Sequence, residues 1–101
     1  MQKTILSEVF DLLKQIEVVS SESEFSRNWL CKSECYLRTM RFKKTEPSIG
    51  AMAICASKLQ HHGKTMVQTE AHRQLGEKFL YLSDKCHERI NSRGKLAWLH
   101  E

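Results

Sequence analysis

Apolar residues recur along this chain at steps of three and four, a spacing that predicts five helices and no strand. The first helix covers residues 5–19, and its apolar face spans about half of its circumference. Ser21 and Glu24 form a capping box, in which each side chain satisfies a free backbone donor, so a second helix is expected to begin at Ser21. The inward residues of the first helix are Ile5, Leu6, Val9, Phe10, Leu12, Leu13 and Ile16.

The second and third predicted helices are short and meet at a tight turn. Phe25 and Trp29 stand four residues apart and therefore share one face of the second helix. The periodicity breaks after Leu30, and Ser33 is a candidate N-cap for a third helix over residues 33–42. The inward positions of this third helix are Tyr36, Leu37 and Met40.

The fourth predicted helix begins at Ser48. Pro47 disfavours helix at the residue before it, and the Ser48 hydroxyl can cap the helix that follows. Gly63 is a natural left-handed residue after a helix end, so the helix is expected to stop at residues 61–63. Its inward face is rich in small residues and consists of Ile49, Met52, Ala53, Cys55, Ala56 and Leu59.

The last third of the chain predicts one long helix, over about residues 65–91 and roughly 40 Å long. A globule of about 100 residues has a radius of gyration of only ~13 Å, so such a helix is expected to overhang the first four. An overhanging apolar stripe indicates a second chain, and a homodimer is the predicted assembly. The predicted dimer interface comprises Val67, Ala71, Leu75, Phe79, Leu82, Cys86, Ile90 and Trp98.

Two alternatives to this dimer remain open. The helix can fold back on its own domain, or Gly76 can break it into two shorter pieces. Residues 91–94 are expected to end the helix and to leave a tail over residues 95–101. Leu96, Trp98 and Leu99 of that tail can cover a partner subunit, present an anchor to another protein, or remain disordered.

Composition restricts the class of protein. The chain has 101 residues, of which 41% are hydrophobic and 28% charged, and this balance is typical of one soluble globular domain. No apolar run approaches the ~18 residues that a membrane span needs, and no secretory signal pattern opens the chain, so a cytoplasmic location is expected. The four cysteines lack a CxxC pair, which favours free thiols over disulfides or a metal site. No catalytic or cofactor motif is present, and we expect neither an enzyme nor a cofactor.

The charge is distributed unevenly. Residues 1–31 carry a net charge of −2, whereas residues 32–47 carry five basic and two acidic residues, a net charge of +3. The basic block begins where the third helix is predicted, as attraction to nucleic-acid phosphates would require. A solvated charged face is the alternative interpretation.

Residues 24–59 resemble the lambda-repressor-like (Cro/C1-type) helix-turn-helix domains. The resemblance is carried by Tyr36–Leu37, by Met40, by Pro47–Ser48 at the start of the following helix, and by the apolar face over Ala53–Leu59. With the first helix included, it covers about the first sixty residues. The turns are atypical, because residues 30–31 and 42–43 contain no glycine where that family usually has one.

The resemblance implies that the helix at about residues 33–42 is a recognition helix in the DNA major groove. It places Ser33, Glu34, Cys35, Arg38 and Thr39 toward the base edges. Arg38 is the best candidate for base reading, because a guanidinium can bind guanine in a bidentate manner. Glu34 can accept a hydrogen bond from cytosine or simply complement the helix dipole. Contacts to phosphates, which position a domain without reading sequence, are expected of Lys32, Arg41, Lys43 and Lys44.

These observations predict an all-α, five-helix, repressor-like helix-turn-helix domain over residues 1–62. Residues 63–101 form a C-terminal helix and tail, interpreted as the dimerisation element of the same domain. The predicted function is sequence-specific binding of double-stranded DNA by a small bacterial transcriptional regulator that acts as a homodimer. The alternative is a helical protein–protein interaction module or adaptor that has a repressor-like fold, does not bind DNA, and uses the C-terminal helix and tail as its working surface.

Overall fold

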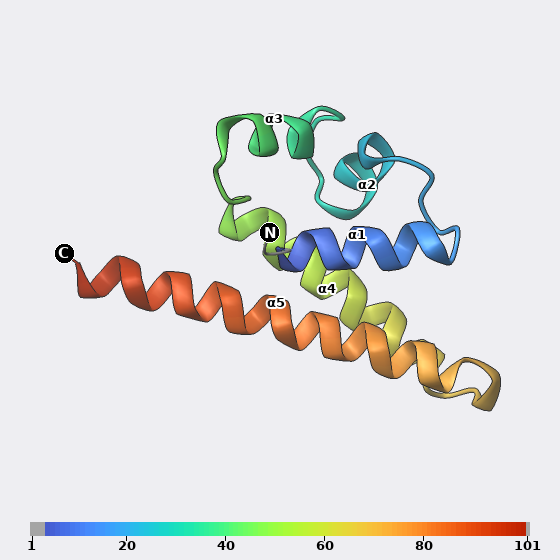
Figure 1. The fold of residues 1–101 in the computed structure, drawn as a ribbon. Coiled ribbons are helices and arrows are strands. Elements are labelled where there is room, and N and C mark those ends of the chain that lie inside the picture. Colours follow the sequence, from blue (N-terminus) through green and yellow to red (C-terminus); the bar gives the residue numbers. More distant parts are fainter. Residues whose placement is uncertain (1–3, 101) are drawn as a thin grey trace.

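Helices make up most of the structure, a computed structural model that describes residues 4–100 (Figure 1). The order of elements is α1 (Ile5–Gln15), α2 (Glu22–Trp29), α3 (Tyr36–Lys43), α4 (Ile49–Met66), the 3₁₀ turn η1 (Glu70–His72) and α5 (Arg73–Leu99). Residues 4–100 contain no strand. The prediction of an all-α fold with a long C-terminal helix is therefore confirmed.

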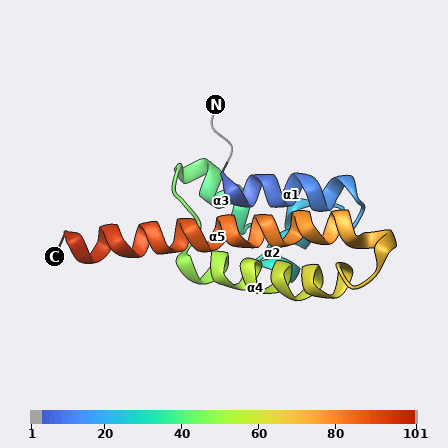
Figure 2. The same cartoon turned by 90° about the horizontal axis from the view of Figure 1, so that it is seen from below.

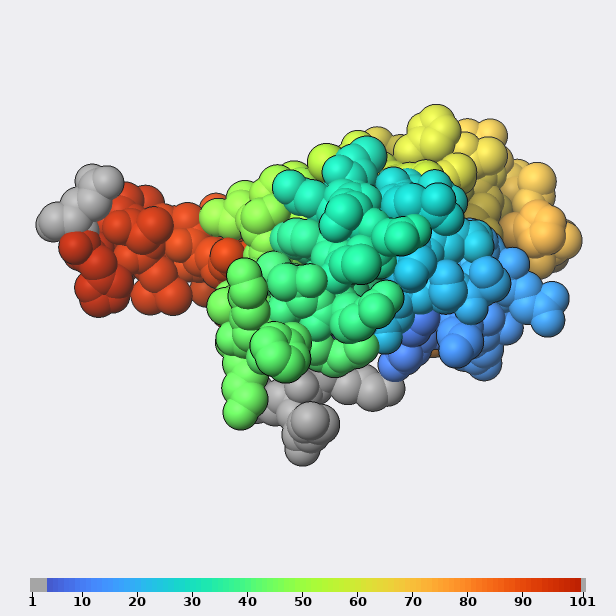
Figure 3. All heavy atoms as spheres, turned by 90° about the horizontal axis from the view of Figure 1, so that it is seen from above, coloured from blue at the N-terminus to red at the C-terminus, as the bar shows by residue number. Residues whose placement is uncertain are grey.

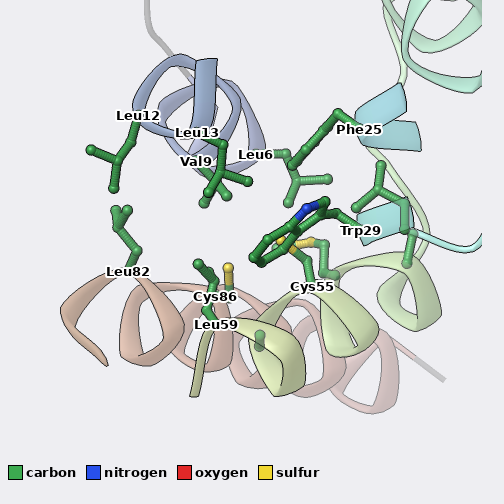
Figure 4. Packing of buried hydrophobic residues seen from close by; sticks show 14 of the residues in the cluster. Leu6, Val9, Leu12, Leu13, Phe25, Trp29, Cys55, Leu59, Leu82 and Cys86 are labelled. Atoms are coloured by element: carbon green, nitrogen blue, oxygen red, sulfur yellow. The ribbon is translucent and has the colours of Figure 1, made fainter. Parts of the chain in front are cut away.

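The long helices α4 and α5 form an antiparallel hairpin, and α1 packs along α5 beside it (Figure 2). The short helices α2 and α3 lie on the side of the molecule away from α5 (Figure 1). Phe25 and Trp29 of α2 reach down between α1 and α4 and close the core (Figure 4). The buried apolar side chains are Leu6, Val9, Leu12, Leu13, Val19, Phe25, Trp29, Leu30, Ala51, Met52, Cys55, Ala56, Leu59, Phe79, Leu82 and Cys86.

Hydroxyl caps begin three of the helices. The backbone N–H of Ser7 donates to the Thr4 hydroxyl (3.1 Å), that of Glu24 to Ser21 (3.2 Å), and that of Ala51 to Ser48 (3.1 Å). Each bond satisfies one of the donors that a helix leaves free in its first turn. The predicted caps at Ser21 and Ser48 are thus confirmed. The reciprocal half of the capping box differs, because the Glu24 carboxylate accepts a hydrogen bond from the Ser20 hydroxyl (2.8 Å).

The start of α3 differs from the sequence prediction. The helix begins at Tyr36 rather than Ser33, and residues 30–35 form a longer connection instead of a tight turn. Cys31 adopts a left-handed conformation (φ 53°), and the Lys32 N–H donates to the carbonyl of Ser26 (3.0 Å). The Ser33 carbonyl accepts from the Tyr36 N–H (3.1 Å), so Ser33 opens a separate turn before the helix rather than capping it.

The predicted end of α4 at Gly63 is also wrong, because the helix continues to Met66. Gly63 is buried inside the helix, and a Cβ at this position would lie 2.9 Å from the Leu80 side chain and 3.0 Å from the carbonyl oxygen of Gly76. The glycine therefore permits the close approach of α4 and α5 rather than a left-handed helix end. As a result, α4 crosses the proposed division after residue 62.

The bounds of α5 are shifted relative to the prediction. It begins at Arg73 after the 3₁₀ turn rather than at about residue 65, and it runs through residues 91–94 to Leu99. Asn, Ser and Gly each cost a helix no more than ~1 kcal/mol, which is too little to end a helix that is anchored by its preceding turns. Gly76 does not break it either.

The first part of α5 packs against its own chain, whereas its C-terminal end protrudes beyond it. Phe79, Leu82 and Cys86 are buried in the core of their own chain, so these three members of the predicted dimer stripe pack internally. The C-terminal end of α5 extends past the other elements (Figures 2 and 3). The radius of gyration is 14.0 Å, while the longest dimension is 47 Å.

The remaining members of the predicted stripe have varied environments. Leu75 and Ile90 pack against the core and are half-buried, and Val67 is half-buried beside Gly76. Ala71 is exposed in η1, and Trp98 is exposed on the overhanging end. No helix within residues 4–100 is both long and apolar enough to cross a membrane.

Candidate nucleic-acid interface

Helix α3 lies on the surface and buries none of its side chains completely. Its inner side is formed by Tyr36, Leu37 and Met40, which are half-buried, as the helical spacing predicts. The Tyr36 hydroxyl accepts a hydrogen bond from the backbone N–H of Ser48 (2.8 Å). This bond ties the start of α3 to the start of α4 and fixes which side of α3 faces outward.

The outward face of α3 combines a cation with an aromatic ring. Cys35, Arg38 and Phe42 follow one another at steps of three and four, so they share this face. Phe42 is 88% exposed, and it is the most exposed large apolar side chain among the described residues. Thr39 is half-buried at the side of the helix.

The other predicted contact residues lie at the two ends of α3. Lys32, Ser33 and Glu34 are exposed in the connection that precedes the helix. Lys43 is its last residue, and Lys44 follows in the left-handed conformation (φ 56°, ψ 38°) that ends it. The structure therefore gathers all nine predicted residues on or beside one short helix. The segment that contains α3 lies on the surface of the molecule (Figure 3).

Two of the cations are already engaged within the chain. The Arg41 guanidinium forms an ion pair with the Glu22 carboxylate of α2, and the Lys32 ammonium lies 5.6 Å from the centre of the Tyr36 ring. Over residues 4–100, no ion pair involves Arg38, Lys43 or Lys44. These three residues therefore carry the uncompensated positive charge of the surface.

A shallow hollow of about 330 Å³ separates α3 from the α1–α2 connection. Glu22, Glu34, Arg38 and Arg41 all line it. One oxygen of Glu22 binds Arg41, and the other is buried with no hydrogen-bond partner in the described chain. The acidic side of the surface thus faces α2, and the basic side faces the end of α3.

The exposure of Phe42 is the feature that sequence reasoning missed, since the helical pattern predicts Phe42 only as the end of the third helix. The signal was available in the spacing: Phe42 stands four residues after Arg38, on the side opposite Tyr36 and Met40. The thiols and histidines offer no comparable site. Among the described residues, no three His, Cys, Asp or Glu side chains are grouped so that they could hold a metal ion.

The sequence of residues 6–99 matches a family described as a family of unknown function, DUF6626. The chain belongs to this family. DUF6626 spans all of α5, including its overhanging end, and all of α1 except the first residue, so the family corresponds to the entire helical fold. No curated protein and no solved structure matches the chain.

Proposed function

We propose that this DUF6626 protein is a sequence-specific DNA-binding protein, a transcriptional regulator that docks α3 against the major groove of double-stranded DNA as a homodimer. The observation that carries the proposal is a set of three exposed cations on α3 and at its end, Arg38, Lys43 and Lys44, which form no ion pair within residues 4–100. The lambda-repressor-like pattern of residues 24–59 supports the same assignment.

The residues of this surface divide into reading and positioning roles. Arg38 lies in the middle of the outward face, where its guanidinium can hydrogen-bond to O6 and N7 of guanine, a contact worth ~1–3 kcal/mol of discrimination. Lys43 and Lys44, at the end of α3, are placed to neutralise phosphates and to release their counterions. Lys32 at the other end can contact the same backbone.

The connection over residues 30–35 changes the expected docking geometry. The turn between the two helices of a helix-turn-helix usually has three or four residues, and this chain has six. The orientation of α3 is therefore set by the bond between Tyr36 and Ser48 and by the Arg41–Glu22 pair rather than by a tight turn. The proposal requires only that the outward face of α3 be free to enter the major groove of DNA.

The test is fluorescence anisotropy of a random-sequence DNA duplex from about 50 to 300 mM salt, with the wild type and the triple variant Arg38→Ala/Lys43→Ala/Lys44→Ala. Loss of three phosphate or base contacts is expected to reduce the slope of log affinity against log salt by up to ~2.7, at ~0.9 for each phosphate contact. A matched control removes three exposed cations at the far end of the hairpin, Lys64, Arg73 and Lys78.

The control separates a local site from general attraction. The control variant is expected to keep most of the affinity and most of the salt slope of the wild type. Equal losses in the two variants, or no binding by the wild type at the lowest salt, would contradict the proposal. If binding is found, selection of preferred sequences from a random pool tests base reading by Arg38.

A second function is favoured by one specific observation. Phe42 and Trp98 are 88% and 62% exposed, and large exposed aromatic side chains are frequent anchors in protein–protein interfaces. A chain that fails to bind DNA but still presents these rings is a helical interaction module or adaptor. In that case Phe42→Ala or Trp98→Ala abolishes capture of its protein partner without unfolding the chain.

A further inference from the structure

The overhanging end of α5 exposes three large apolar side chains. Leu96, Trp98 and Leu99 are 50%, 62% and 54% exposed on a segment that extends past the rest of the chain (Figure 2). A short helix without tertiary contacts is marginally stable in water, and a helix that is apolar on several sides is normally buried. Burial of these apolar side chains against another surface would therefore stabilise this segment.

A groove of about 650 Å³ lies just before the overhang, between α1, α5 and the start of α4. Ile5, Leu6, Pro47 and Met52 supply its apolar part, and all of these except Ile5 are buried. The rest of the lining is polar and consists of Thr4, Glu8, Glu46, Lys85, Glu88, Arg89 and Ser92. On one side, Arg89 and Arg93 of α5 both bind the Glu46 carboxylate, so the charge of Glu46 is already compensated.

The groove and the overhang share one face of α5. Arg89 and Ser92 line the groove, and Leu96 and Leu99 follow at steps of four and three residues, one and two turns further along. An apolar protrusion and a groove with both apolar and charged walls thus lie side by side on the same helix. Two identical chains related by a two-fold axis can fill each other's groove with each other's protrusion.

We propose that two copies of this chain associate antiparallel along the C-terminal half of α5, each placing Leu96 and Leu99 against the groove of the other. The inference rests on the homodimer of the proposed function but not on its DNA binding. It also replaces the interface expected from the sequence, since Phe79, Leu82 and Cys86 are buried within each chain.

One pair of opposite charges favours an antiparallel direction and one register. Glu88 and Lys95 are both exposed and stand seven residues, about two turns, apart on this side of α5. An antiparallel pair centred between residues 91 and 92 sets Glu88 of each chain opposite the partner's Lys95. A parallel pair in register would instead oppose like charges, which is destabilising.

The first test measures self-association by sedimentation equilibrium across micromolar to submillimolar protein. Glu88→Lys and Lys95→Glu, each alone, remove two symmetric ion pairs and create like-charge contacts, so each is expected to raise the dissociation constant by about tenfold or more. The combined variant, Glu88→Lys/Lys95→Glu, restores opposite charges and is expected to recover most of that loss. Lys64→Glu, at the far end of the hairpin, is the control and is expected to leave the constant unchanged.

The second test locates the apolar contact and the axis. Leu96→Ser/Leu99→Ser is expected to abolish the dimer, whereas Trp98→Ser, on a different side of the helix, leaves it largely intact. In a background with the exposed Cys31 and Cys35 changed to Ser, Ser92→Cys is expected to cross-link two chains with a short bismaleimide. Lys64→Cys in the same background is expected not to cross-link.

Several outcomes would overturn the inference. One is a wild type that stays monomeric throughout the concentration range. Another is a combined charge variant whose dissociation constant is as high as that of the single variants. The third is a dimer that is lost in Trp98→Ser but kept in Leu96→Ser/Leu99→Ser. Far-ultraviolet circular dichroism of each variant distinguishes lost association from lost folding. The Arg38→Ala/Lys43→Ala/Lys44→Ala variant is expected to dimerise normally, so a failure of DNA binding and a failure of this interface are observed separately.

Discussion

Replacement of Gly76 by alanine tests how closely α4 and α5 pack. In an open helix the change stabilises, because alanine is favoured over glycine by ~1 kcal/mol. At Gly76 the added Cβ would lie 2.8 Å from Met66 Cβ, 2.8 Å from Val67 Cγ1 and 2.9 Å from the backbone nitrogen of Val67. A rotamer change cannot relieve the contacts with the Met66 Cβ and the Val67 nitrogen, so the end of α4 must move.

Such overpacking typically costs ~1–3 kcal/mol, which exceeds the helix-propensity gain. We therefore expect Gly76→Ala to lower the free energy of unfolding by about 1–2 kcal/mol, and each 1 kcal/mol corresponds to roughly 4–8 °C in melting temperature for a domain of this size. Gly94 of the same helix is the matched control, since a Cβ there meets no atom within 4 Å. Gly94→Ala is expected to raise the free energy of unfolding by about 0.5–1 kcal/mol.

The assay is thermal unfolding followed by far-ultraviolet circular dichroism, repeated at two protein concentrations so that self-association does not enter the comparison. The reasoning predicts opposite signs for one and the same chemical change at two positions of one helix. Gly76→Ala that stabilises as much as Gly94→Ala would refute the close approach of α4 and α5 at this point.

Three further predictions concern buried and paired groups. Cys55 and Cys86 are fully buried. The hydrogen bond with Cys86, and then burial, raise the pKa of the Cys55 thiol well above its usual value. Ellman's reagent should therefore react only with the exposed thiols of Cys31 and Cys35 until the chain is denatured. His62 is exposed beside Trp29, and partial desolvation, followed by the positive charges of His61 and Lys58, lowers its pKa, so its ring protons should titrate by NMR with a midpoint below about 6.5. Because the unfolded chain then binds the proton more tightly, the stability contributed by neutral His62 is present above about pH 6.5 and is lost as the pH falls below it; a midpoint at or above 6.5 would contradict this. The buried hydroxyl of Ser83 donates to the carbonyl of Ala56 (2.8 Å), and Ser83→Ala should lower the free energy of unfolding in urea by about 1 kcal/mol, while an unchanged midpoint would show that the bond contributes nothing.

The sequence predicted the elements of this fold better than their ends. Caps at Ser21 and Ser48 are local, since a hydroxyl needs only the N–H three residues ahead, and both were found correctly. The end of α4 was predicted wrongly, because the role of Gly63 depends on its contact with Gly76, 13 residues later in the sequence. A glycine that ends a helix and a glycine that admits a neighbouring helix are indistinguishable until the tertiary contact is known.

The candidate site was predictable in composition but not in detail. Helical spacing correctly separated the inner residues Tyr36, Leu37 and Met40 from Arg38, but it did not predict that the apolar Phe42 would be exposed on the outward face. It did not reveal that Arg41 is paired with Glu22, nineteen residues earlier, and so contributes less free charge than Lys43 and Lys44. Of the stripe predicted along the last helix, Leu75, Phe79, Leu82, Cys86 and Ile90 share the inner face of α5, whereas Val67 and Ala71 precede this helix and Trp98 is exposed. Periodicity alone does not say which chain covers an apolar face.

The proposed DNA-binding surface on α3 and the proposed dimer surface on α5 are held to the rest of the chain by different interactions. The outward face of α3 belongs to a helix with no buried side chain, held by the polar bond between Tyr36 and Ser48 and by an exposed ion pair, each worth on the order of 1 kcal/mol. The α5 face, in contrast, is continuous with the tightly packed α4–α5 hairpin. Substitutions on α3 can therefore change binding with little effect on stability, which makes the salt dependence of the triple alanine variant interpretable. The overhanging end of α5 continues the helix of the hairpin, so an association that stabilises this end can hold two α3 surfaces in a defined relation.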